Sequence, residues 1–177
     1  PGDATEFAPW HPRRLGGRDV LDALPDRAAA DLVRRAIGEV VTAEGPVRAE
    51  RLASLVANAF DLTKVNENRR EQILRHVPPE LRRDRVEDVV WPAGVDPEAW
   101  TRYRPAGESS PRRFTEVPLR EIGNARAALV AAGGGMERAE LHGETLRVFG
   151  LLRRTQAAVE RLDTALELSR GRYLDVD

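Results

Sequence analysis

The chain has 177 residues, enough for one or two small domains with a buried core. Its 28 basic and 29 acidic residues nearly cancel, and the formal net charge of −1 excludes the strongly basic composition of a dedicated nucleic-acid binder. The absence of cysteine excludes disulfides, thiolate catalysis and cysteine-based zinc sites.

Aromatic residues are sparse (5%), which leaves the core to alanine, leucine and valine and so favours helices. No apolar stretch is long enough to cross a bilayer and no signal peptide is visible, so we expect no membrane partner and a cytoplasmic location. The sequence begins at Pro1 rather than at a methionine, and we therefore expect it to be part of a longer polypeptide.

Residues 1–24 are predicted to form an extended lead-in whose apolar side chains pack on the first module. From residue 26 to residue 43, apolar side chains recur with the i, i+3, i+4, i+7 spacing of an amphipathic helix. They are Ala29, Leu32, Val33, Ala36, Ile37, Val40 and Val41. Gly45 and Pro46 end this helix, because glycine closes helices and proline cannot continue one.

Two further helices are predicted over residues 49–60 and 66–76. Residues 81–91 then contain valines and a tryptophan that suit a short strand pair with a turn near Asp84. Three helices followed by a small hairpin is the winged-helix arrangement, which we predict for a first module spanning residues 25–91.

A proline-rich connector is predicted over residues 92–117, followed by a second winged-helix-like module over residues 118–177. Its first helix ends at the glycines of residues 133–135, and its third begins near Gln156. Residues 169–177 are expected to form only a shortened wing. The predicted fold class is therefore mainly α with small β wings (α+β), built from tandem winged-helix-like modules.

An internal repeat supports two modules of one kind. Residues 44–77 and 133–166 align without a gap at an offset of 89 residues, with five identities. The identical pairs are Gly45 and Gly134, Leu52 and Leu141, Phe60 and Phe149, Leu62 and Leu151, and Glu71 and Glu160. A tandem pair of small modules suggests a binding function, so the question becomes what the pair binds.

Several ordered segments carry a resemblance to a known family. They read WHPRRLGGRDVLDALPD, AIGEVVTAEGPVRAERLASLVANAFDL and VVWPAGVDPEAW, and later EIGNARAALVAAGGG and ELHGETLRVFGLLR. Together they resemble the bacterial domain-of-unknown-function family 3320. In that family the domain typically lies near the C-terminus of large proteins that carry a superfamily-one helicase-like ATPase, often with a nuclease domain. The resemblance implies a DNA-processing accessory region and supplies no catalytic residues.

The third helix of each module is a candidate for major-groove contact. In the first module Asn68, Gln72 and Arg75 point outward and suit base edges, whereas Glu67 and Glu71 would oppose phosphates. The alternative is a solvated face with a Glu71–Arg75 ion pair. In the second module the outward residues include Arg153 and Arg161.

A second basic cluster surrounds the predicted wing and the connector. Its members are Arg82, Arg83, Arg85, Arg102, Arg104, Arg112 and Arg113. If these side chains converge, they form a stripe that contacts phosphates without reading sequence, and Trp100 and Tyr103 are placed to stack on bases. The alternative is ordinary surface arginines beside aromatics that hold the connector to the modules.

Catalytic and metal-binding patterns are absent. His11, His76 and His142 are scattered, so no pair has the spacing of metal ligands. The glycines at 133–135 are followed by no Lys-Ser/Thr, so they do not form a phosphate loop. We therefore expect a non-enzymatic region without metal or cofactor.

Protein docking is the alternative to DNA contact, since winged helices also serve as docking and dimerisation units. The partner would then be the ATPase or nuclease domain of the same long polypeptide, or a second copy of the chain. An exposed apolar patch would favour docking, and a continuous arginine face would favour nucleic acid.

Overall fold

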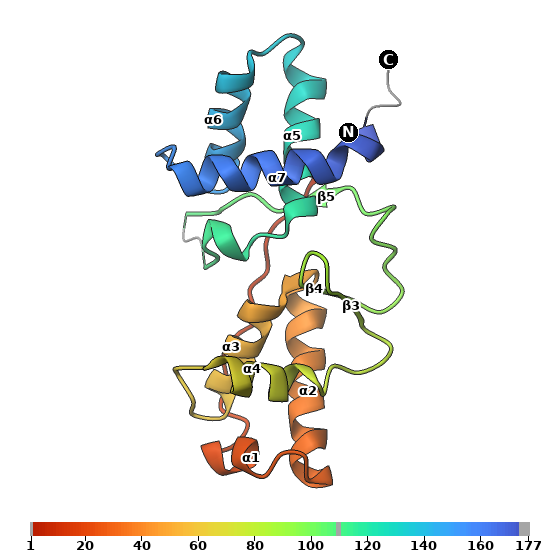
Figure 1. The fold of residues 1–177 in the computed structure, drawn as a ribbon, viewed down its shortest axis with the longest axis vertical. Coiled ribbons are helices and arrows are strands. Elements are labelled where there is room, and N and C mark those ends of the chain that lie inside the picture. Colours follow the sequence, from red (N-terminus) through yellow and green to blue (C-terminus); the bar gives the residue numbers. More distant parts are fainter. Residues whose placement is uncertain (1, 109–110, 174–177) are drawn as a thin grey trace. The chain divides into compact units, whose positions relative to one another are not determined.

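The computed structural model describes residues 2–108 and 111–173 (Figure 1). The chain divides into two compact units. We call residues Ala8–Pro97 the inserted unit, and Pro1–Phe7 together with Glu98–Asp177 the split unit. Both units consist mainly of helices with a few short strands, which confirms the predicted mainly α class with small β elements. None of the described helices combines the length and apolar character needed to cross a membrane.

The inserted unit contains four helices and a three-stranded sheet. Its elements are α1 (Arg18–Asp22), α2 (Arg27–Glu44), β2 (Val47–Arg48), α3 (Ala49–Ala59), α4 (Glu67–Leu74), β3 (Arg82–Asp84) and β4 (Val89–Trp91). The sheet is antiparallel throughout, with the order β2-β4-β3. Helix α2 ends at Glu44, as the following glycine and proline predicted. The three helices and the following hairpin occur in the predicted order, but the sequence did not predict β2, a third strand that lies between α2 and α3 and pairs with β4.

The core of the inserted unit lies between its helices and its sheet. The apolar stripe of α2 is fully buried, with Val33, Ile37 and Val40 inaccessible to solvent. Val47 and Val90, which face each other across β2 and β4, belong to the same buried cluster. The sheet therefore closes one side of the helical core.

The lead-in is held to the inserted unit by a buried carboxylate. Glu44, at the end of α2, accepts hydrogen bonds from the backbone N–H of Trp10 (3.0 Å) and from the Arg51 guanidinium (2.6 and 2.9 Å). Trp10 and Leu21 are buried, as predicted for anchoring residues. A buried carboxylate with several donors is stable because its lone pairs are satisfied.

The split unit contains three main helices and a two-stranded parallel sheet. Its elements are β1 (Asp3–Ala4), β5 (Arg102–Tyr103), the 3-10 helix η1 (Phe114–Glu116), α5 (Leu119–Gly133), α6 (Arg138–Val148) and α7 (Gln156–Tyr173). Strands β1 and β5 are paired. The core is built around Phe114, Ile122, Leu146, Phe149 and Leu162.

The unit boundary lies elsewhere than predicted, because the start of the chain joins the second half. Asp3 pairs with Arg102 across the parallel strands, and the ring of Phe7 lies 4.0 Å from Arg112 Cζ. The predicted lead-in over residues 1–24 is therefore divided between the two units. Most of the predicted connector over residues 92–117 belongs to the split unit.

A buried charge cluster fastens the connector to α5. Glu121 is inaccessible to solvent and accepts hydrogen bonds from the Arg104 and Arg112 guanidinium groups at 2.9–3.1 Å. It also accepts one from the backbone N–H of Arg104 at 2.8 Å. Burial alone would raise the pKa of Glu121, but the two arginines outweigh it and hold that pKa below its usual value.

The internal repeat is present in the structure as well as in the sequence. The bounds of α3 shifted by 89 residues are those of α6, and the start of α4 shifted likewise is the start of α7. Phe60 and Phe149 each follow the second helix of their copy, and the next residues, Asp61 and Gly150, both have positive φ. The matching backbone bonds are Leu62 N–H to Ala57 O and Leu151 N–H to Leu146 O, both 3.0 Å.

The shortened wing predicted over residues 169–177 is wrong for residues 169–173, which continue α7; residues 174–177 lie outside the described part. The physical reason lies in the two copies' third helices. Helix α4 ends before Pro78 and Pro79, whereas the aligned residues Glu167 and Leu168 allow α7 to continue. The extended part of α7 packs closely on α5, where a Cβ on Gly123 would lie 2.1 Å from Ser169 Oγ.

Candidate nucleic-acid interface

Helix α4 presents a polar face to solvent. Asn66 caps its start by accepting a hydrogen bond from Arg69 N–H at 2.9 Å. The exposed residues along one side of α4 and just before it are Lys64, Asn68, Gln72 and Arg75. Ile73 and Leu74 are buried on the opposite side. Asn68, Gln72 and Arg75 thus point outward, as the sequence predicted.

The acidic residues of this face are neutralised by neighbouring arginines. Glu67 pairs with Arg70 at 2.8 Å, and Glu71 pairs with Arg83 at 3.3 Å. Arg83 also pairs with Asp88 at 3.1 Å, and its side chain is only 12% exposed. The expected Glu71–Arg75 pair is therefore replaced by one that joins α4 to the hairpin, and Arg83 is withdrawn from the predicted phosphate contacts.

The hairpin between β3 and β4 presents two exposed arginines, Arg82 and Arg85. Asp84 Oδ1 orders the connecting loop by accepting hydrogen bonds from the N–H groups of Val86 (2.9 Å) and Glu87 (3.3 Å). Val86, which the sequence placed in the strand pair, lies in this loop and is 90% exposed. The hairpin thus extends basic and apolar side chains into solvent beside α4.

Four cations on this surface have no carboxylate partner among residues 2–108 and 111–173: Lys64, Arg75, Arg82 and Arg85. The positive field reaches His76, the residue after Arg75. Burial lowers the pKa of His76, and Arg34 and Arg75 lower it further. We call Lys64, Asn68, Gln72, Arg75, Arg82 and Arg85 the α4–hairpin face.

Two arginines of the predicted connector stripe are unavailable for phosphate contact. Arg104 and Arg112 are buried on Glu121, where they fasten the connector to α5. Arg102 is exposed, and Arg113 is exposed beside Glu116, with which it pairs at 3.7 Å. Of the four arginines predicted in the connector, only Arg102 and Arg113 are therefore exposed.

Of the other candidate residues in the split unit, some are exposed and some are packed against the protein. Arg161 donates to the backbone carbonyls of Phe114 and Val117, so it joins α7 to η1 rather than facing solvent. Arg153 is exposed. Tyr103 packs against the split unit's core, which leaves it unsuited to stacking on bases. Wing arginines 82 and 85 belong to the inserted unit, and arginines 102 and 113 to the split unit.

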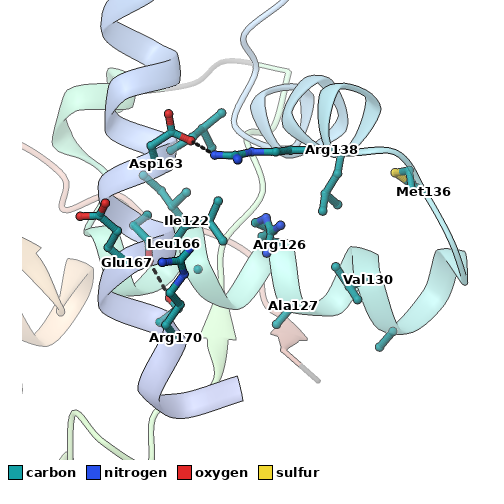
Figure 2. A pocket seen from close by; sticks show the side chains of 16 residues that line it. Ile122, Arg126, Ala127, Val130, Met136, Arg138, Asp163, Leu166, Glu167 and Arg170 are labelled. Atoms are coloured by element: carbon teal, nitrogen blue, oxygen red, sulfur yellow. Dashed lines mark hydrogen bonds and ion pairs between the residues drawn. The ribbon is translucent and has the colours of Figure 1, made fainter. Parts of the chain in front are cut away.

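The split unit also contains a pocket of about 830 Å³ that the sequence did not predict. Helices α5, α6 and α7 line it, and Arg126 lies among its lining side chains between α5 and α6 (Figure 2). The internal repeat carried a signal for it. At the offset of 89 residues, Arg126 aligns with Ile37, a fully buried core residue. The second copy thus has an arginine where the first copy has a buried isoleucine, so the two copies use this surface differently.

A metal centre finds no support in the described part of the chain, which holds no group of three or more histidine, cysteine, aspartate or glutamate residues placed to bind a metal ion. Of the histidines, His142 is buried with its Nε2 3.7 Å from Asp163 Oδ1. Burial lowers the pKa of His142, Asp163 raises it, and the nearby arginines 138, 154 and 126 lower it again, leaving a net decrease.

Comparison with known proteins concerns the inserted unit. No curated protein and no solved structure matches the chain. One family model matches, over a segment that begins at the end of α1 and includes α2, β2, α3 and most of α4. Residues 22–71 are thereby similar to the family described as "Protein of unknown function (DUF3320)".

Proposed function

We propose that the chain is a non-catalytic accessory region that contacts the nucleic-acid backbone through the α4–hairpin face of the inserted unit. The observation that carries the proposal is the sorting of charge on this face. The two carboxylates of α4, Glu67 and Glu71, are held in ion pairs with Arg70 and Arg83, while Lys64, Arg75, Arg82 and Arg85 have no such partner in the described chain. A surface with free cations and neutralised acids attracts phosphates.

The order of elements supports a winged-helix-like use of this face. Helices α2, α3 and α4 followed by the β3–β4 hairpin are the parts of that arrangement, in which the third helix enters the major groove. In this proposal Asn68 and Gln72 lie near base edges, and the four cations contact phosphates. Because phosphate contacts dominate, binding depends weakly on sequence and strongly on salt.

The wider context is also a proposal. The resemblance to the family implies that the region serves a longer helicase-like or nuclease-like polypeptide in the cytoplasm. In that setting the inserted unit guides DNA toward the motor, and the split unit contacts other parts of the assembly. The pocket of the split unit is the observation that favours this second, protein-docking role.

Charge reversal on the α4–hairpin face is expected to abolish most nucleic-acid affinity. We would titrate fluorescently labelled duplex and single-stranded DNA with the full chain at two salt concentrations. Changing Arg75, Arg82 and Arg85 to glutamate should weaken binding at low salt by at least about tenfold, and the log–log salt slope should fall by about 0.9 for each arginine that contacts duplex phosphate.

Arg35→Glu is the matched control, because Arg35 is an exposed arginine on α2 of the same unit. It changes the net charge in the same direction as each of the three substitutions but lies off the α4–hairpin face. The control should retain most of the wild-type affinity. Equal binding by the wild-type chain and the triple variant, or a flat salt response of the wild type, would contradict the proposal.

A further inference from the structure

The pocket of the split unit is a groove whose inner wall is apolar and whose lining also includes five charged residues: Arg126, Arg138, Asp163, Glu167 and Arg170. Ile122, Leu141 and Leu162 form its inner wall and are nearly inaccessible to solvent, whereas Val130 is 50% exposed. Exposed apolar surface in a concave site is costly in water and marks a place for a binding partner. A binding partner with chemistry complementary to the lining would bury this exposed apolar surface.

The corresponding positions of the inserted unit show how this face is completed elsewhere in the same chain. At the offset of 89 residues, the aligned pairs are Val33 and Ile122, Ile37 and Arg126, Val41 and Val130, Val47 and Met136, Leu52 and Leu141, and Ile73 and Leu162. All six residues of the inserted unit are at most 2% exposed. All six belong to one closed core cluster, which also contains Trp10 and Leu21 of the lead-in and Val90 of β4.

In the described part of the split unit, α7 continues where the inserted unit turns into its hairpin. Ile122, Leu141 and Leu162 are still buried there. The other three positions, at Arg126, Val130 and Met136, are partly or half exposed. The open part of the groove thus corresponds to positions that lie in the closed core of the inserted unit.

Arg126 gives the groove its chemical preference. Its Nε is buried without a hydrogen-bond partner in the described structure. Burial lowers the pKa of Arg126, and the nearby charge of Arg138 lowers it further. Arg138 itself pairs with Asp163 at 3.0 Å, as the dashed line in Figure 2 marks. Asp163 is thereby engaged, and no carboxylate within residues 2–108 and 111–173 pairs with Arg126, although a partly buried guanidinium favours one.

The rim carries one charge of each sign. Glu167 and Arg170 are both exposed on α7 and line the outer part of the groove. Exposed charges of opposite sign contribute little net preference. The charge complementarity of the site is therefore set by Arg126, and an occupant with a carboxylate is favoured over a neutral or basic one.

We propose that the groove between α5, α6 and α7 binds a short apolar segment of a partner protein whose carboxylate pairs with Arg126. Apolar side chains of the segment cover Val130 and Met136, and the carboxylate pairs with the partly buried guanidinium. This inference concerns the split unit only and does not depend on nucleic-acid binding by the inserted unit.

The chain itself supplies a suitable probe. Residues 86–92, with the sequence VEDVVWP, combine two carboxylates with the apolar residues of β4. We would titrate this peptide, labelled with a fluorophore, into the full chain and compare it with a version in which its two acids are replaced by glutamine and asparagine. The acidic peptide should bind roughly tenfold more tightly, as one additional charge-assisted hydrogen bond predicts.

Two substitutions separate charge from shape. Arg126→Ile introduces the residue of the inserted unit; it should remove the preference for the acidic peptide and raise Tm, because an unsatisfied guanidinium is lost. Ala127→Trp fills the groove and should abolish binding of both peptides while circular dichroism shows an intact fold. Arg27→Ile, at an exposed arginine of the inserted unit, should change nothing.

Four outcomes would overturn the inference. The first is that neither peptide binds the wild-type chain at millimolar concentration. The second is that both peptides bind the Ala127→Trp variant with the same affinity as the wild type. The third is that the Arg126→Ile variant still prefers the acidic peptide. If the wild-type chain is instead a dimer that Ala127→Trp converts to a monomer, the occupant is a second copy and the partner-segment proposal fails.

Discussion

Replacing Glu121 with leucine is expected to destabilise the split unit by about 3–5 kcal/mol, the usual cost of removing one member of a buried ion pair. The substitution leaves the Arg104 and Arg112 guanidinium groups buried without their carboxylate. It also removes the acceptor for the backbone N–H of Arg104. Because this cluster fastens the connector to α5, hydrogen exchange in both segments should accelerate together.

The measurement is urea unfolding combined with hydrogen exchange resolved by peptide. Glu144→Gln is the control, since Glu144 forms an exposed ion pair with Arg147 within α6, and its loss should cost less than about 1 kcal/mol. Equal costs for the two substitutions would show that the Glu121 cluster is not shielded from water.

The same cluster predicts a pH dependence with a definite sign. The pKa of Glu121 is lowered in the folded state, so its stabilising contribution is present above the ordinary value of 4.5. That contribution is lost as the pH falls toward the lower pKa of the folded state. Glu121→Leu should accordingly reduce the acid sensitivity of the split unit as well as its stability at neutral pH.

Phe60→Ala is expected to destabilise the inserted unit by about 3–5 kcal/mol, because it leaves a cavity in a fully packed core. Phe60 is inaccessible to solvent and belongs to the main cluster of that unit. A Cβ placed on Gly16 would approach its ring to 3.1 Å, which shows how closely the lead-in covers it. Collapse into the cavity is therefore restricted on that side.

The aligned substitution Phe149→Ala should destabilise the split unit through the same mechanism, since Phe149 is 4% exposed and occupies the same place in the repeat. Val86→Ala is the control, because Val86 is 90% exposed and its change should stay within about 0.5 kcal/mol. Thermal or urea unfolding of the variants measures these costs. A small cost for either phenylalanine would mean that the repeat does not share a common core.

Helix bounds and the repeat were predictable because local chemistry determines them. Gly45 and Pro46 end α2, and apolar spacing orients its stripe regardless of what lies elsewhere in the chain. The division into units was not predictable in this way. Strands β1 and β5 are two residues each and pair across most of the chain, so they leave no periodic pattern.

The candidate sites were also only partly predictable, because they depend on contacts between residues far apart in the sequence. An arginine in a sequence does not reveal whether a carboxylate lies beside it in the fold; Arg83, Arg104 and Arg112 acquire theirs only through tertiary packing. Arg126 is different, because extending the offset of 89 residues beyond the repeat places it opposite Ile37, an apolar residue on the predicted inner stripe of the first helix. That exchange of an apolar residue for an arginine was visible in the sequence, whereas the groove beside it depends on how α5, α6 and α7 pack.

Nuclear magnetic resonance mapping of the isotope-labelled full chain tests the assignment of the α4–hairpin face most directly. Adding short duplex DNA should shift the amide signals of residues 64–75 and 82–88 and leave those of residues 122–138 unchanged. The acidic peptide should do the reverse. Duplex-induced shifts confined to the split unit, or no shift in α4 and the hairpin at saturating DNA, would contradict nucleic-acid contact through the inserted unit.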